Sequence, residues 1–326
     1  DSPDMENEYF CNGIMVEILN QLHKIGDLKV KSRTSVEKYR NTDKDIKVIG
    51  QELGVSMIME GSVRKIGDDL RIATQLIDAR TGDHIWSEVY DGKYAKEIFN
   101  FQSGVAKKVA TSLKAAIKPE EKTRIDKKPT ADMRAYDLVA KASEIMYSGR
   151  LSDDSTTWSR HWEVAMNLFN QALKIDPLYR DAFSGKAKLF VNSGRLDSAR
   201  IYYKKSLELD PMDPNTKLDI GVLYQALNKP DSAYYYIKIG LDGGLKYSWA
   251  FMLMGQHLLY FKNDVIGAIK YYQKAYDASE VEDANMYWNF SILFNRIGDY
   301  TRSLKYDNKA LSQVSDCYWI YEINCY

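Results

Sequence analysis

"LFNQALKIDP" (Leu168–Pro177) and "YYKKSLELDP" (Tyr202–Pro211) are two versions of one ten-residue pattern, and they begin 34 residues apart. Small residues follow the same spacing at Ala165, Ala199 and Ala233, and continue with one-residue slips to Ala268 and Ser303. A period of this length predicts a stack of helix–turn–helix units, each burying its apolar face only against its neighbours. Each copy ends on a proline because proline cannot continue a helix.

The residue types within the period indicate how the units pack. The small residues allow the two helices of a unit to approach closely, and the aromatic residues Phe169, Tyr203 and Tyr272 fill the space between units. The pattern resembles tetratricopeptide repeats over about 190 residues. This resemblance implies about five repeats in residues 129–326, wound into an all-α superhelix with a concave groove.

The resemblance also implies where a partner would bind. The groove of tetratricopeptide repeats is lined by the first helix of each repeat, and amides and cations there suit hydrogen bonds to an extended peptide or its carboxylate. The corresponding positions in this sequence are Lys188, Asn192, Gln225, Gln256, Trp288, Asn295 and Arg296. The alternative is that these residues are only the solvated faces of helices.

The amino-terminal part of the chain has a different pattern. Residues 53–92, "LGVSMIMEGSVRKIGDDLRIATQLIDARTGDHIWSEVYDG", predict three antiparallel strands joined by turns at Gly67 and Gly82. Helical periodicity precedes and follows them, and the alternation in "LKVKS" (28–32) predicts one further short strand. We therefore expect an α+β sandwich in residues 1–128, with helices on a mixed sheet and a helical linker at its end. Because the sequence opens on a helix, we expect the first strand of this α+β domain to lie upstream of Asp1.

Two segments carry a second resemblance. "IGQELGVSMIMEGSVRK" (Ile49–Lys65) and "RIATQLIDARTGDHIWSEVYD" (Arg71–Asp91) are similar to the TolB-like amino-terminal domain, over roughly residues 1–118. That domain lies between an output module and tetratricopeptide repeats in bacterial adenylate cyclases and in CadC-like and HilA-like transcription regulators. Its leading apolar strand has no counterpart in this sequence. The family has no established catalytic residues in this domain, so the resemblance implies none.

Reactive groups and charge give no sign of chemistry. Lys plus Arg and Asp plus Glu both total 45, so we expect no direct contact with nucleic acid. The four histidines and three cysteines (Cys11, Cys317 and Cys325) have no metal-ligand spacing, and no glycine-rich phosphate loop occurs. We therefore expect no enzyme activity, no cofactor and no metal site in this chain.

The location and assembly of the protein are less constrained. No run of about 18 apolar residues occurs, so we expect no membrane span in this chain. We favour the periplasmic side of a membrane-tethered protein, with the cytoplasm as the alternative. The oligomeric state stays open.

Three functions compete. We favour a non-enzymatic interaction or sensory module of a bacterial regulatory protein, with a protein or peptide as its partner. The second possibility is the accessory region of a nucleotide cyclase whose catalytic domain lies outside this chain. The third is a small-molecule sensor at the domain junction, lined by Tyr136, Trp158 and Trp162, although both tryptophans also fit as packing residues of the first repeat.

Overall fold

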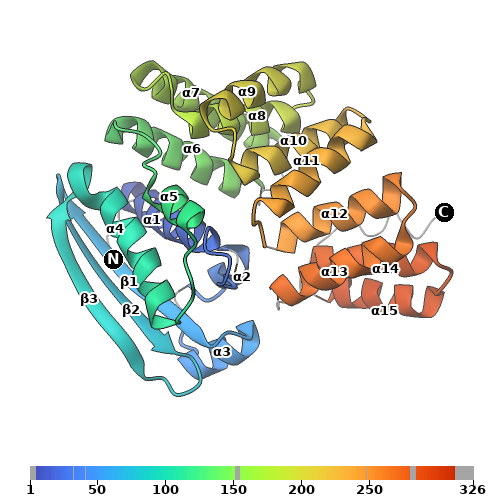
Figure 1. The fold of residues 1–326 in the computed structure, drawn as a ribbon, viewed down its shortest axis with the longest axis horizontal. Helices are drawn as coiled ribbons and strands as arrows, with labels where there is room; N and C mark the ends of the chain where they lie inside the picture. The colour runs from blue at the N-terminus through green and yellow to red at the C-terminus, as the bar shows by residue number, and fades with distance from the viewer. Residues whose placement is uncertain are drawn as a thin grey trace.

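A computed structural model of the chain describes residues 5–31, 33–40, 42–150, 155–246, 248–279 and 284–312. A small α+β unit forms the amino-terminal part, and an arc of paired helices forms the rest (Figure 1). The arc bends around the amino-terminal unit, whose helices α1, α2 and α5 face its inner side (Figure 1). The elements of the amino-terminal unit are α1 (Met5–His23), α2 (Arg33–Glu37), α3 (Ile46–Leu53), β1 (Met57–Ile66), β2 (Asp69–Asp78), β3 (His84–Lys93), α4 (Tyr94–Ser112) and α5 (Pro119–Asp126).

The three strands form one antiparallel sheet in the order β1-β2-β3. Gly67 and Gly82 have φ angles of +60° and +83°, so both turns use the left-handed conformation that glycine tolerates. Alternate residues of β2 are buried, as in Leu70 and Ile72, because α1 and α4 pack on that face of the sheet. The three strands and their turns are therefore as the sequence predicts.

The prediction of a mixed sheet with a strand at 28–32 is wrong for the described residues. Residues 28–31 form no strand, and the sheet is wholly antiparallel. Leu28 and Val30 still pack against the apolar core, which explains their alternation with polar residues. A strand also needs a neighbour for its backbone hydrogen bonds, and this segment pairs with none of the three strands.

The second part of the chain consists, within the described residues, of five antiparallel helix pairs. They are α6 (Met133–Arg150) with α7 (Ser155–Ile175), α8 (Arg180–Asn192) with α9 (Leu196–Leu209), α10 (Pro214–Ala226) with α11 (Pro230–Asp242), α12 (Ser248–Phe261) with α13 (Val265–Ser279), and α14 (Ala284–Arg296) with α15 (Tyr300–Leu311). The small residues of the repeat are buried where the helices of a pair meet: Ala165, Ala199, Ala233 and Ala268 are each 0% exposed, and Ser303 is 5% exposed.

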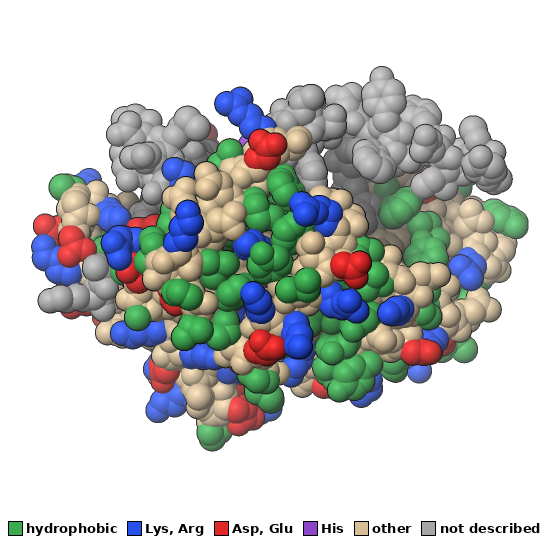
Figure 2. Space-filling view, turned by 90° about the horizontal axis from the view of Figure 1, so that it is seen from above, with side chains coloured by type: hydrophobic (Ala, Val, Ile, Leu, Met, Phe, Trp, Pro, Cys, Tyr) green, Lys and Arg blue, Asp and Glu red, His purple; other side chains and the backbone are tan. Residues whose placement is uncertain are grey.

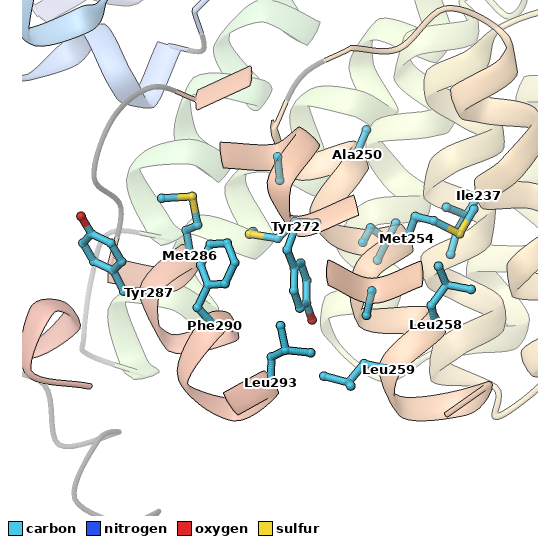
Figure 3. Close-up of a cluster of buried hydrophobic side chains, with 14 of the residues drawn as sticks. Ile237, Ala250, Met254, Leu258, Leu259, Tyr272, Met286, Tyr287, Phe290 and Leu293 are labelled. Carbon is cyan, nitrogen blue, oxygen red and sulfur yellow. The ribbon is translucent and has the colours of Figure 1, made fainter. Parts of the chain in front are cut away.

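The aromatic residue of the period fills space between and within pairs. In the carboxy-terminal core, Tyr272 of α13 lies between α12 and α14 (Figure 3). A Cβ atom at Gly255 would lie 2.6 Å from the Tyr272 ring, and the centre of the Phe290 ring is 5.9 Å from the centre of the Tyr272 ring. The period therefore places a glycine where the ring needs room.

Candidate functional site: the inner face of the helical repeats

The inner face of the arc is formed by the first helix of each pair. The successive first helices α6, α8, α10, α12 and α14 contact one another directly. Helices on the concave side of a superhelix lie closer together than those on the convex side, so these contacts identify the concave face. All seven residues predicted to bind a partner lie on α8, α10, α12 or α14.

Lys188 joins two of these helices. Its exposed side chain on α8 forms an ion pair with Asp219 of α10, with 3.0 Å between Nζ and Oδ2. The Asp219 side chain is 10% exposed, so this ion pair lies in a nearly desolvated environment. Lys188 therefore holds neighbouring repeats together.

Gln256 joins the next pair of first helices in the same way. Its Nε2 on α12 donates a hydrogen bond of 2.9 Å to Oδ1 of Asn289 on α14, and Asn289 is 1% exposed. Arg296 donates to Oδ1 of Asn263 at 3.2 Å, in the turn after α12. It also lies near Tyr260. Burial raises the pKa of the Tyr260 phenol, and the arginine charge opposes this upward shift.

The other four predicted residues present accessible side chains. Asn192 and Asn295 are exposed, and Gln225 and Trp288 are half-buried. Gln225, Trp288 and Asn295 lie on α10 and α14, toward the carboxy-terminal end of the inner face. The accessible amides and one tryptophan are suited to hold an extended backbone and one large apolar side chain.

The sequence reasoning missed Asp219 and Asn289, the buried partners in these bridges. Asp219 follows Lys188 by 31 residues, and Asn289 follows Gln256 by 33, so the two bridges differ in their offset from the 34-residue period. No single offset from a groove position identifies both bridges, so the repeat pattern carries no signal for them.

The amino-terminal end of the inner face is occupied by the protein's own α1. Asn12 on α1 donates to Oε1 of Glu144 on α6 at 3.2 Å. At the next residue of α1, a Cβ atom on Gly13 would lie 3.4 Å from the Cβ atom of Ala140, one turn before Glu144 on α6, which is ordinary van der Waals contact. Helix α1 therefore packs closely along α6.

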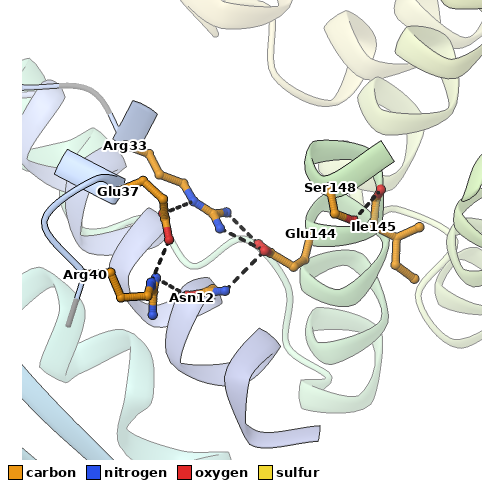
Figure 4. Close-up of polar contacts among 7 residues, drawn as sticks. All are labelled: Asn12, Arg33, Glu37, Arg40, Glu144, Ile145 and Ser148. Atoms are coloured by element: carbon orange, nitrogen blue, oxygen red, sulfur yellow. Dashed lines mark hydrogen bonds and ion pairs between the residues drawn. The ribbon is translucent and has the colours of Figure 1, made fainter. Parts of the chain in front are cut away.

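A charged cluster fixes this contact (Figure 4). Arg33, at the start of α2, donates to both oxygens of Glu144 at 2.5 and 2.8 Å, and its guanidinium lies 4.0 Å from the centre of the Tyr147 ring. Burial disfavours the Arg33 charge, yet the hydrogen bonds to Glu144 and Glu37 outweigh it and raise the guanidinium pKa. Asn12, Arg33, Glu37, Arg40 and Glu144 are called the clamp below.

Two further contacts extend the docked surface. Gln102 of α4 donates to the hydroxyl of Tyr136 at 3.0 Å, and the ring of Phe99 meets Tyr136 edge-on. At the other end, Arg124 of α5 donates to the Gly243 carbonyl at 3.0 Å, in the turn before α12. The amino-terminal unit thus contacts the first repeat and the turn between the third and fourth repeats, and the carboxy-terminal half of the inner face lies beyond these contacts.

A small polar cavity of about 210 Å³ lies between α1, α4 and the end of α5, beside the linker to the repeats. Gln21, Phe99, Ser103 and Lys127 are among its lining residues. It is smaller than the roughly 300–1,000 Å³ typical of ligand pockets. Of the three residues predicted to line a junction site, Tyr136 and Trp162 are absent from its lining, and the side chain of Trp158 lies outside the described residues.

Trp162 has the packing role that was its alternative. Its Nε1 donates to the Leu189 carbonyl at 3.1 Å, and its ring meets Phe190 edge-on at 6.3 Å between centres. It therefore joins the first repeat to the second.

Within the described ranges, no group of three or more His, Cys, Asp or Glu side chains could hold a metal ion. The same ranges contain no helix that is both long and apolar enough to cross a bilayer. Cys317 and Cys325 lie outside the described residues.

Comparison with known proteins supports the repeat assignment. A tetratricopeptide-repeat family model matches residues 181–212, which cover α8 and α9. In the crystal structure of the APC/C hetero-tetramer Cut9–Hcn1, a chain 17% identical to this one superposes with a TM-score of 0.50, covering 57% of this chain and 35% of that one.

A curated relative is "Putative adenylate cyclase 3" from Rhizobium meliloti (strain 1021). It is 33% identical over 177 residues, covering 54% of this chain and 28% of the relative. The match thus spans little more than a quarter of the relative's length. Taken with the matched repeat and the paired helices, the comparisons show that the helical part of this chain has the tetratricopeptide-repeat fold.

Proposed function

We propose that this chain is a non-enzymatic interaction or sensory module of a bacterial signalling protein. It binds a protein or an extended peptide on the carboxy-terminal half of its inner face. The observation that carries the proposal is the accessible surface of α10 and α14, with Gln225, Trp288 and Asn295, next to a half that α1 already fills. Tetratricopeptide arrays commonly use this surface for partners.

Each part of the chain would have its own role. The amino-terminal unit, which we propose to be a TolB-like domain, acts as the adaptor that the clamp holds rigidly against the first repeat. Lys188, Gln256 and Arg296 then act mainly as links between repeats, because each is bonded to a neighbour. Trp288 and Asn295 provide the direct contacts, together with Gln225 and Asn192.

A peptide selected from a random twelve-residue display library against the intact chain provides the test. We expect Trp288→Ala and Asn295→Ala to weaken its binding at least tenfold in calorimetry, which corresponds to about 1.4 kcal/mol. Tyr235→Ala is the matched control, because Tyr235 is 58% exposed on α11, outside the inner face. Equal affinity of all variants would contradict the proposal.

The outer side of the array is a suitable control surface. Val164 of α7 and Ile201 of α9 are 43% and 56% exposed. On the face seen in Figure 2, hydrophobic side chains are interleaved with Lys and Arg. Scattered exposed apolar residues are normal on protein surfaces. If Tyr235→Ala weakened binding of the peptide and Trp288→Ala did not, the binding site would lie on this outer side.

The relative named as an adenylate cyclase favours the second candidate function, in which the module belongs to a nucleotide cyclase. The catalytic domain would then lie outside this chain. If the gene continues upstream of Asp1, a cyclase-sized domain there would support this candidate. A winged-helix pattern followed by an apolar span of about 20 residues would support a transcription regulator instead.

A further inference from the structure

The outer edge of β1 exposes backbone groups that no described strand pairs with. Because β1 and β2 are joined by the two-residue turn Gly67–Asp68, Ile66 and Asp69 form the hydrogen-bonded pair that closes the turn. Backbone groups alternate in direction along a strand, so the even-numbered residues of β1 bond β2. The odd-numbered residues, Met57 to Lys65, direct their N–H and C=O groups to the open edge.

This edge is long and accessible. β1 has 10 residues, and its middle, from Glu60 to Ser62, is exposed. Ile66 is 72% exposed. An exposed edge of this length is a template for pairing with another strand.

The side chains along β1 are complementary to those of the same strand read in the opposite direction. On the solvent face of the strand lie Ile58, Glu60, Ser62, Arg64 and Ile66, in that order. If two such strands run antiparallel about Ser62, each Ile58 faces an Ile66 and each Glu60 faces an Arg64. Opposite charges and apolar residues that face each other across strands stabilise a sheet.

Arg64 provides a separate reason for this register. In the β1–β2 ladder it lies directly opposite Arg71, and like charges in that position are destabilising. Arg71 is bridged to Asp91 at 3.5 Å, whereas Arg64 forms no ion pair with a described residue. A carboxylate on the open side of Arg64 would offset the repulsion.

We propose that β1 pairs with β1 of a second copy of this chain, antiparallel and centred on Ser62, to form a continuous six-stranded sheet. In this register the odd-numbered residues, whose backbone groups are free at the edge, become the hydrogen-bonded pairs Met59–Lys65 and Gly61–Val63. Glu60 of one chain forms an ion pair with Arg64 of the partner subunit, and the two-fold axis generates a second, identical pair.

Shifted registers lose these pairs. A shift by two residues in either direction places Glu60 opposite Ser62 or Ile66, and larger shifts bring Glu60 or Arg64 opposite its own copy. The other edge strand, β3, has no equivalent symmetry, since Ile85, Ser87, Val89, Asp91 and Lys93 on its solvent face pair no opposite charges when centred on Val89. The edge of β1 is therefore the self-complementary one.

A charge exchange tests the register. The molar mass of the intact chain is measured by sedimentation over a concentration series, with a dimer expected for the wild type. Arg64→Glu brings two glutamates together at each end and should shift the dimerisation constant at least tenfold toward monomer. The double variant Glu60→Arg with Arg64→Glu restores the opposite pairs and should restore the dimer. A monomeric wild type, or a double variant as weak as Arg64→Glu, would overturn the proposal.

A cross-link tests the two-fold axis directly. With the three native cysteines replaced by serine, Ser62→Cys should form a disulfide-linked dimer on mild oxidation, because residue 62 faces itself. Gln75→Cys, on the solvent face of the central strand β2, is the matched control. It should stay monomeric in non-reducing gel electrophoresis. Equal cross-linking of both variants, or none at residue 62, would refute the pairing.

Discussion

His257 is a buried imidazole with no hydrogen bond. It is 0% exposed in α12, and neither ring nitrogen has a partner in the described structure. Its ring stacks on Phe261 at 5.2 Å and lies 5.8 Å from Tyr234 of α11, so it links two repeats as an aromatic residue would. Burial lowers its pKa; the Lys262 charge adds to this effect and Asp231 opposes it.

The pKa of His257 predicts a loss of stability in acid. Since the folded pKa lies below the unfolded value of 6.5, the unfolded chain binds more protons in that window. This contribution to stability is complete above pH 6.5 and is lost as the pH falls below it. We expect His257→Leu to show a smaller decrease in the free energy of unfolding between pH 7.5 and 5.5, measured by urea titration.

The same substitution should be neutral or stabilising at pH 7.5, by up to about 2 kcal/mol, because it removes an unbonded polar group from the core. His84→Gln at an exposed position is the control. We expect some acid sensitivity to remain in His257→Leu, because burial also lowers the pKa of His23. A pH profile of His257→Leu parallel to that of the wild type would contradict this account.

At the scale of elements, helix spacing depends on glycines that face aromatic rings. Gly185 of α8 faces Phe169 of α7, and a Cβ atom there would lie 2.3 Å from the ring. Phe169 is 0% exposed and therefore has no room to move away. The close approach of the first repeat to the second requires a residue without a side chain at this position.

We therefore expect Gly185→Ala to destabilise the chain by about 1–3 kcal/mol through overpacking, despite the better helix propensity of alanine. Gly104→Ala in α4 is the matched control, because no atom apart from its own helix backbone lies within 4 Å of its Cβ position. That variant should gain up to about 1 kcal/mol. Urea unfolding of both variants measures the difference, and a stabilised Gly185→Ala would show that α7 and α8 pack differently.

Elements whose partners are close in the chain could be predicted from the sequence. The 34-residue period located the buried small residues, for example Ala199 and Ala233, because each lies where two consecutive helices meet. The segment 28–31 had the alternation of a strand, yet alternation reports only which side chains are buried. Whether a strand forms depends on a neighbouring edge, which the local pattern does not contain.

At the scale of the whole molecule, the docking of α1 on the inner face could not be read from the sequence. Arg33 and Glu144 are 111 residues apart, and no periodicity relates them. The same limit applies to Lys188, Gln256 and Arg296, which the family positions suggested as partner-binding residues. Their bonds to neighbouring repeats depend on how the superhelix curves.

The clamp should determine how rigidly the two units are joined. The side chains of Arg33 and Glu144 are 13% and 20% exposed, so we expect Glu144→Ala to cost about 1.5–3 kcal/mol of docking free energy. Hydrogen exchange should accelerate in α1 and α2 while α14 and α15 stay protected. Glu52→Ala, which breaks the exposed Lys44–Glu52 pair, is the control and should have a much smaller effect, because exposed ion pairs contribute little to stability. Equal effects of both variants would mean that the clamp does not hold α1.

The most direct measurement of the central claim is a hydrogen-exchange footprint of the intact chain with a display-selected peptide. We predict new protection on α10, α12 and α14, with no change on α9, α11 and α13. Helix α6 should also be unchanged, because α1 already covers it. Protection confined to the outer helices or to the sheet would contradict the assignment of the inner face as the binding surface.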